Sequence, residues 1–128
     1  EADPEVLPLL VDALREETLE ALPPWPEGVV VAGLNKHAQK VLHEGEVVAA
    51  LYGADAARLT VGAPFPYDEY VLVLQGKVVL TSEDGSSQTF VMGEGFLVPK
   101  GWTGSWDMPD QYLEKIIVET TAWNEAEG

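Results

Sequence analysis

The feature that most constrains the fold is a succession of short β-type segments separated by glycine-containing turns, beginning at Val29. The segments are rich in β-branched and aromatic residues, and no helical pattern lies between them. This arrangement predicts antiparallel strands in a sandwich or barrel rather than a parallel sheet. Glu83–Gly85 predicts a tight hairpin, because Asp-Gly supplies the positive φ of a primed turn. The predicted strands are 29–31, 41–43, 47–52, 58–61, 70–74, 77–81, 87–91, 95–98 and 114–120.

A helical pattern precedes the strands. Asp3 and Pro4 resemble a helix start, and leucine and alanine then recur three to four residues apart as far as Leu22. The proline-rich stretch from Pro23 to Gly28 ends this pattern. We therefore expect an N-terminal helical arm with a Pro-rich linker at 1–28 and a β-barrel domain at 29–128. The arm is too short to be a second domain, so we expect it to cover a sheet face or to reach a partner subunit.

Composition limits the class of protein. The 128 residues are 46% hydrophobic, which suits a single domain with a real core. Asp and Glu number 22 against 7 Lys and Arg, and the net charge of −15 argues against binding nucleic acid or anionic membranes. The chain has no cysteine, and it has no apolar run approaching the roughly 18 to 20 residues of a membrane span. We expect a cytoplasmic protein; because the sequence starts at Glu1, a periplasmic location stays open.

Two glycine motifs carry a family resemblance. Glu69 is followed after six residues by Gly76, and Gly93 is followed after five residues by Pro99 and then by Gly101. These spacings resemble the two motifs of the cupin superfamily. The stretches 67–71, 74–81 and 93–106 are similar to the cupin family of ureidoglycine aminohydrolase-like and ethanolamine-utilisation-like proteins, over about residues 45 to 119. The resemblance implies an all-β, single-domain cupin, a double-stranded β-helix or jelly-roll-like barrel, here with an N-terminal helical arm.

The sequence departs from this family at the metal ligands. Metal-dependent cupins use two histidines upstream of the motif glutamate and one histidine in the second motif. The corresponding positions are Phe65 and Ala63, or Pro64 and Gly62, and then Gly104. Only Glu69 remains, and one carboxylate does not hold a metal that needs three or four protein ligands. We therefore expect no metal and no cofactor.

The chain has two histidines, His37 and His43. One alternative is an atypical metal site made by His43, Glu69 and a further carboxylate. We expect instead that both histidines are exposed or lie at strand edges, next to turns.

Glu69 and the aromatic residues are the candidate site. A carboxyl at the motif position would point into the barrel, have a raised pKa and suit a general acid or base; the alternative is a structural role at the barrel mouth. Gly104 would leave room beside Trp102 and Trp106, and an aromatic cavity with one carboxylate favours an amine or another cation. Alternatively, the tryptophans simply fill the barrel. The predicted ligand-binding residues are Tyr52, Phe65, Tyr67, Glu69, Phe96, Trp102 and Trp106.

Strands 70–74 and 116–118 are apolar on both faces, so their outer faces should be covered, and we expect a homodimer. Three functions remain open. The first is a metal-free cupin that binds a small organic molecule in its barrel. The second is an enzyme resembling the ureidoglycine aminohydrolase-type cupins, which acts on a small nitrogenous or carboxylic metabolite with Glu69 as acid or base. The third is an interaction protein that uses the outer sheet alone.

Overall fold

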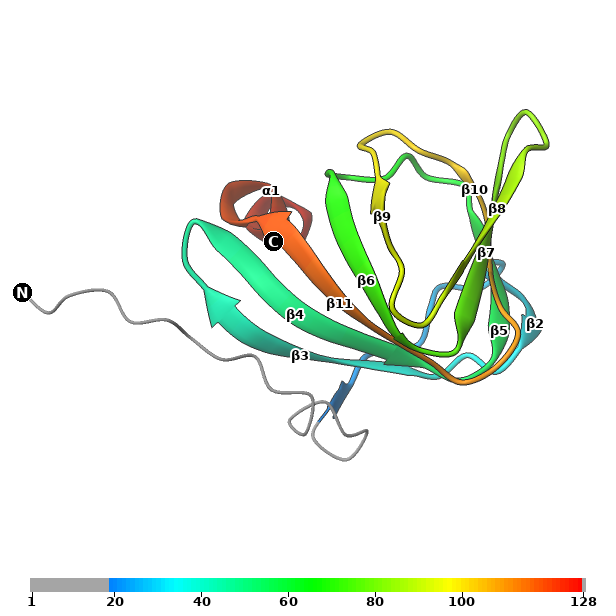
Figure 1. The fold of residues 1–128 in the computed structure, drawn as a ribbon, viewed down its shortest axis with the longest axis horizontal. Helices are drawn as coiled ribbons and strands as arrows, with labels where there is room; N and C mark the ends of the chain where they lie inside the picture. Colours follow the sequence, from blue (N-terminus) through cyan, green and yellow to red (C-terminus); the bar gives the residue numbers. More distant parts are fainter. Residues whose placement is uncertain (1–18, 128) are drawn as a thin grey trace, which may run out of the picture.

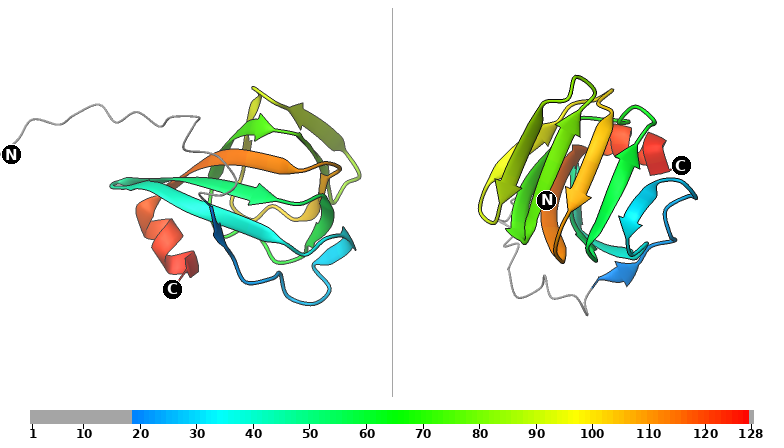
Figure 2. Two further views of the ribbon diagram at one scale, coloured as in Figure 1. Left: turned by 90° about the horizontal axis from the view of Figure 1, so that it is seen from below. Right: turned by 90° about the vertical axis from the view of Figure 1, so that its right-hand side faces the viewer.

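Two antiparallel sheets face each other in the computed structural model, which describes residues 19–127 (Figure 1). The six-stranded sheet has the order β1 (Glu20–Ala21), β3 (His37–Glu44), β4 (Val47–Ala54), β11 (Tyr112–Glu119), β6 (Glu69–Gln75) and β9 (Gly95–Val98). The five-stranded sheet has the order β2 (Val30–Gly33), β5 (Ala57–Val61), β10 (Gly104–Met108), β7 (Lys77–Ser82) and β8 (Ser87–Val91). Figure 2 shows the same two layers from two other sides.

Each predicted strand corresponds to a strand of the structure, and the hairpin turn is confirmed. Gly85 has a φ of 88°, and its amide donates to the Ser82 carbonyl oxygen at 2.9 Å. The sequence did not predict β10. Its residues Gly104–Met108 follow closely on Pro99 and Gly101 and resemble a continuing turn, yet they pair with both β5 and β7.

The predicted N-terminal helix is wrong where the structure describes it. Glu20–Ala21 form β1, which pairs with β3, because an edge strand there satisfies backbone groups that a helix would satisfy internally. Residues 1–18 of the predicted arm lie outside the described residues. The single helix found within residues 19–127 is α1 (Thr120–Glu127), which follows β11 directly (Figure 1). The Glu119 carboxylate begins it by accepting the Thr121 amide at 2.9 Å.

The two sheets do not close into one continuous barrel. Within residues 19–127, no backbone ladder joins β9 to β8 or β1 to β2. The prediction of a barrel therefore holds for the jelly-roll-like pairing of two sheets and is wrong for closure.

Alternating burial places one face of each strand between the sheets. Along β11, Tyr112, Glu114, Ile116 and Val118 are buried and the residues between them are more exposed. The same alternation occurs in β6, where Glu69, Val71 and Val73 point inward. Each sheet therefore presents an apolar inner face, and two acidic side chains, Glu69 and Glu114, lie on the inner face of the six-stranded sheet. The two sheets together contribute one hydrophobic core, which includes Val48, Ala50, Leu59, Val71, Val73, Val78, Val98, Trp106, Met108, Ile116 and Val118.

The outer face of β6 and β9 exposes apolar side chains. Tyr70 is 61% exposed, and Leu72 and Leu97 are also exposed. The homodimer expected from the sequence stays a prediction. No helix within the described residues has the length and apolar character needed to cross a membrane.

Substitution of Gly76 tests how tightly the turn between β6 and β7 is packed. The φ of Gly76 is +78°, and a Cβ on this residue would collide with the Gln111 carbonyl oxygen. Gly85 has a similar φ of +88°, but a Cβ on Gly85 would point into open space. Both Gly→Ala substitutions incur the left-handed penalty of about 1–2 kcal/mol, and only Gly76→Ala adds a backbone clash. We expect Gly76→Ala to lower the free energy of unfolding, measured by urea denaturation, clearly more than Gly85→Ala. Equal losses would show that the turn relaxes freely.

Candidate functional site

A cavity of about 370 Å³ opens between the two sheets, within the range of small-molecule sites. Both sheets, α1 and the segment between β1 and β2 contribute to its wall. The lining residues are Leu22, Pro23, Trp25, His37, Gln39, Tyr52, Leu59, Val61, Phe65, Tyr67, Glu69, Trp106, Glu114, Ile116 and Trp123.

Two carboxyl groups from adjacent strands line this cavity. Glu69 is the first residue of β6 and is 6% exposed, and Glu114 in β11 is 2% exposed. Glu114 lies on the inner face because it alternates with Ile116, and β11 pairs Glu114 with Val73 of β6. Oε1 of Glu114 is fully buried and has no hydrogen-bond partner among the described residues. Burial of two acids in one cavity is expensive unless they are protonated or paired with a cation.

Burial is the main cause of the raised pKa values of Glu69 and Glu114. Desolvation raises the pKa of Glu69 to about 7. It also raises the pKa of Glu114 well above its ordinary value of 4.5, and the Glu69 charge raises it further. The nearby Tyr112 hydroxyl lowers the pKa of Glu114 and so offsets this rise only in part. No lysine or arginine is among the cavity-lining residues, so the described chain supplies no cation to compensate the two acids.

His37 joins the start of β3 to the segment after β1. Its Nε2 donates to the Pro23 carbonyl oxygen at 2.7 Å, so the neutral ring accepts the Tyr52 hydroxyl at Nδ1, 3.0 Å away. The Trp25 indole stacks on the imidazole, with ring centroids 4.4 Å apart. Desolvation lowers the pKa of His37, which favours this neutral form. The expectation that His37 is exposed is therefore wrong: the residue is 8% exposed and belongs to the cavity wall.

The structure brings five of the seven predicted ligand-binding residues to the cavity: Tyr52, Phe65, Tyr67, Glu69 and Trp106. Phe65 stacks on Trp106 with an interplanar angle of 5°. Two backbone bonds fix Phe65: its amide donates to the Trp102 carbonyl at 3.0 Å, and its carbonyl accepts from Gly101 at 2.8 Å. Asp68, beside Glu69, accepts the Lys100 amide at 2.8 Å. The segment before β6 is therefore held against the turn after β9.

Phe96 and Trp102, the other two predicted residues, lie elsewhere. They line a separate groove of about 490 Å³ beside β8 and β9, where Phe96 stacks on Phe90. Trp102 donates its indole N–H to the Ser82 hydroxyl at 3.1 Å, which keeps its ring on that side. The two rings still support the cavity wall, since Phe96 contacts Trp106 and Trp102 contacts Phe65.

Gly104 does not provide the expected room. A Cβ at this position would collide with the Thr81 carbonyl oxygen and lie 2.7 Å from the Trp102 ring. Backbone and indole already occupy the space that a side chain would need. The glycine therefore permits close strand packing between β10 and β7, and a histidine could not be placed there without moving both neighbours.

The residues present do not fit the metal site that cupins commonly carry. Within residues 19–127, no three histidine, aspartate or glutamate side chains are grouped as metal ligands would be. His43 is not among the cavity-lining residues, so the cavity does not bring it to Glu69. The absence of a bound metal or cofactor itself stays a prediction.

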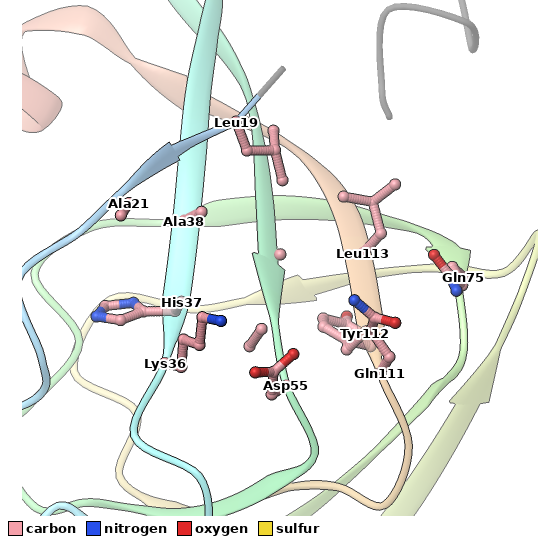
Figure 3. A pocket seen from close by; sticks show the side chains of 12 residues that line it. Leu19, Ala21, Lys36, His37, Ala38, Asp55, Gln75, Gln111, Tyr112 and Leu113 are labelled. Carbon is pink, nitrogen blue, oxygen red and sulfur yellow. The ribbon is translucent and has the colours of Figure 1, made fainter. Parts of the chain in front are cut away.

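A second hollow, of about 200 Å³, lies outside the sheets at the ends of β3, β4 and β11 (Figure 3). Figure 3 shows Lys36, Asp55 and Gln111 around it. It includes none of the seven predicted residues, and it shares only His37 with the main cavity.

Sequence reasoning did not predict ten of the fifteen lining residues, and four of these ten carry a ring or an acid: Trp25, His37, Glu114 and Trp123. Alternation in 112–118 was the available signal for Glu114, because it places this acid on the same face as Ile116 and Val118. Trp123 could not be found in this way. It lies in the unpredicted helix α1 and stacks on Tyr67 at 6.3 Å.

The two facing sheets have the cupin fold, as comparisons with known structures show. A protein of unknown function of the DUF861 family from Pseudomonas syringae is 20% identical, with a TM-score of 0.71 over 78% of this chain and 43% of that one. This chain thus spans less than half of that protein. A cupin superfamily protein from Desulfitobacterium hafniense is 19% identical, with a TM-score of 0.59 over 91% and 93% of the two chains. The EutQ protein of Clostridium difficile is 18% identical, with a TM-score of 0.57 over 66% and 68%.

The particular family follows from the sequence match. Residues 44–116 match the model of the EutQ-like cupin domain, so the chain belongs to this family of cupins. No curated protein matches the chain significantly. The structural neighbours above show the fold alone, because all are less than 25% identical.

The raised pKa of Glu69 makes stability depend on pH. The folded protein holds this proton up to about pH 7, whereas the unfolded chain releases it near 4.5. The folded state therefore binds more protons in this window, and the free energy of unfolding should fall by about 3 kcal/mol as pH rises through it. Glu114 acts in the same direction.

Urea denaturation between pH 4.5 and 8 measures this fall. Glu69→Gln should reduce it, whereas the exposed control Glu83→Gln should leave it unchanged. An equally steep fall in both variants would mean that general charge repulsion, and not the buried acid, sets the dependence.

Proposed function

We propose that this protein binds a small organic molecule in the cavity between its two sheets. The observation that carries the proposal is Glu114, a buried acid in the cavity wall with a carboxyl oxygen that no described group satisfies. Buried polar groups normally have a partner, and a bound ligand is a natural one. The aromatic lining supports the same proposal, because concave sites with many rings and a few polar groups are typical of small-molecule pockets.

Filling the cavity tests this function. Val61 lines the cavity, so Val61→Phe places a ring inside it, and Val91→Phe puts the same ring on the 46% exposed Val91 as a control. A library of small amines, acids, alcohols and amides is screened by thermal denaturation. We expect compounds that stabilise the wild type and Val91→Phe, by about 2.7 kcal/mol at one hundred times Kd, and that do not stabilise Val61→Phe. If no compound stabilises the wild type, or if stabilisation survives in Val61→Phe, the cavity is not a binding site.

An enzyme is the second candidate, and one observation favours it. A carboxyl with a pKa of about 7 in a buried cavity is suited to transfer protons at neutral pH. In this case Glu69 acts as acid or base on the bound molecule.

Turnover separates the two candidates. A compound found in the screen is incubated with the protein, and its conversion is followed by NMR. For an enzyme, we expect Glu69→Gln to lower the rate at least 100-fold while binding persists, and the rate to change across pH 7 with the ionisation of Glu69. Unchanged compound after prolonged incubation with the wild type would favour a binding protein without catalysis.

A further inference from the structure

The charged residues of the cavity indicate which class of small molecule it would bind, and this inference rests on the proposed function. Glu69 and Glu114 are the acidic residues of the lining, and neither lysine nor arginine is present there. The only basic side chain among the lining residues is His37, and burial lowers its pKa and so favours the neutral ring, although the hydrogen bond to the Pro23 carbonyl acts in the opposite direction. An anionic ligand would therefore enter a site with two acids and no compensating cation.

The aromatic residues add a second, independent preference. Six rings besides His37 line the cavity: Trp25, Tyr52, Phe65, Tyr67, Trp106 and Trp123. The faces of such rings carry negative electrostatic potential, and cages of several rings are the common way in which proteins hold organic cations. Rings and carboxyls thus attract the same charge.

Hydrogen bonding indicates which kind of organic cation fits the two carboxyls. An ionised carboxylate only accepts hydrogen bonds, and Oε1 of Glu114 has no donor among the described residues. An ammonium group with N–H bonds satisfies such an acceptor, whereas a quaternary ammonium group cannot donate to it. We propose that the cavity binds a small protonated amine, with its ammonium group against the Glu114 and Glu69 carboxyls and its carbon chain among the aromatic rings.

Binding of a cation should also release protons. Without the cation, burial favours the protonated form of Glu114 and keeps Glu69 about half protonated near neutral pH. The positive charge of the ammonium group stabilises the ionised carboxylates in place of the bound protons, so the acids lose their protons as the cation binds. The titratable groups that face the carboxyls are His37 on β3, Tyr52 on β4, Tyr67 before β6 and Tyr112 on β11. The pKa values of Tyr52 and Tyr112 are raised and that of His37 is lowered, so none of these three takes up the released proton at neutral pH.

The experiment compares ligands of one shape and three charges. Butylammonium, butanol and butyrate are titrated into the protein by calorimetry at neutral pH, in phosphate and in MOPS, neither of which is a primary amine. We expect butylammonium to bind at least tenfold more tightly than the other two. Because phosphate and MOPS differ in their heats of ionisation, the difference between the two buffers measures proton release upon binding. Tetramethylammonium, which cannot donate a hydrogen bond, should bind more weakly than butylammonium.

Variants place the binding at the two acids. Glu114→Gln should weaken butylammonium at least tenfold and abolish proton release, and Glu69→Gln provides the same test if Glu114→Gln does not fold. Glu83→Gln, which removes one exposed charge from the acidic surface, should change nothing, and Val61→Phe should abolish binding.

The outcomes distinguish this inference from the proposed function. If butanol, butyrate or other screened compounds bind in a manner that Val61→Phe abolishes, while butylammonium binds no better, the cavity is a binding site and the amine inference is wrong. Full butylammonium affinity in both Glu114→Gln and Glu69→Gln would likewise overturn the inference. If nothing in the screen binds, the inference and the proposed function fail together.

Discussion

The pairing of β11 with both β4 and β6 is the constraint on which the rest of the structure depends. β11 pairs with β4 along its whole length, from Tyr112 opposite Ala54 to Glu119 opposite Val47. This register turns Glu114 inward, and a shift by one residue would instead direct Lys115 into the cavity. The same strand leads directly into α1 and so places Trp123. The acidic character and the aromatic closure of the cavity therefore depend on a single register.

Most of the fold could be predicted because its signals are local. Short β-branched runs and glycines with positive φ, such as Gly76 and Gly85, mark strand ends without reference to the rest of the chain. The errors occur where tertiary pairing overrides local preference. Glu20–Ala21 follow a helical pattern but pair with β3, and the two sheets do not join at their edges, which no strand pattern reveals.

The candidate site was only partly predictable for a related reason. Glu69 and its neighbouring aromatics were identifiable because the motif spacing marks the start of β6. Glu114 was overlooked, because an acid beside Lys115 resembles an exposed strand end even though its alternation with Ile116 places it on the inner face. His37 is buried by contacts with Pro23 and Trp25, which lie more than ten residues away in the chain. The histidine count predicted that the common metal site is missing, but it did not predict that one of the two histidines lines the cavity.

The cavity wall takes a ring from each end of the described chain, Trp25 just after β1 and Trp123 in α1. During synthesis, the ribosome releases the strands of both sheets before it releases Trp123. A nascent chain can therefore pair most of its sheets while the cavity still lacks the ring that stacks on Tyr67. The complete cavity wall is in this sense a late product of folding, formed only by a chain that has been translated nearly to the end of the described region.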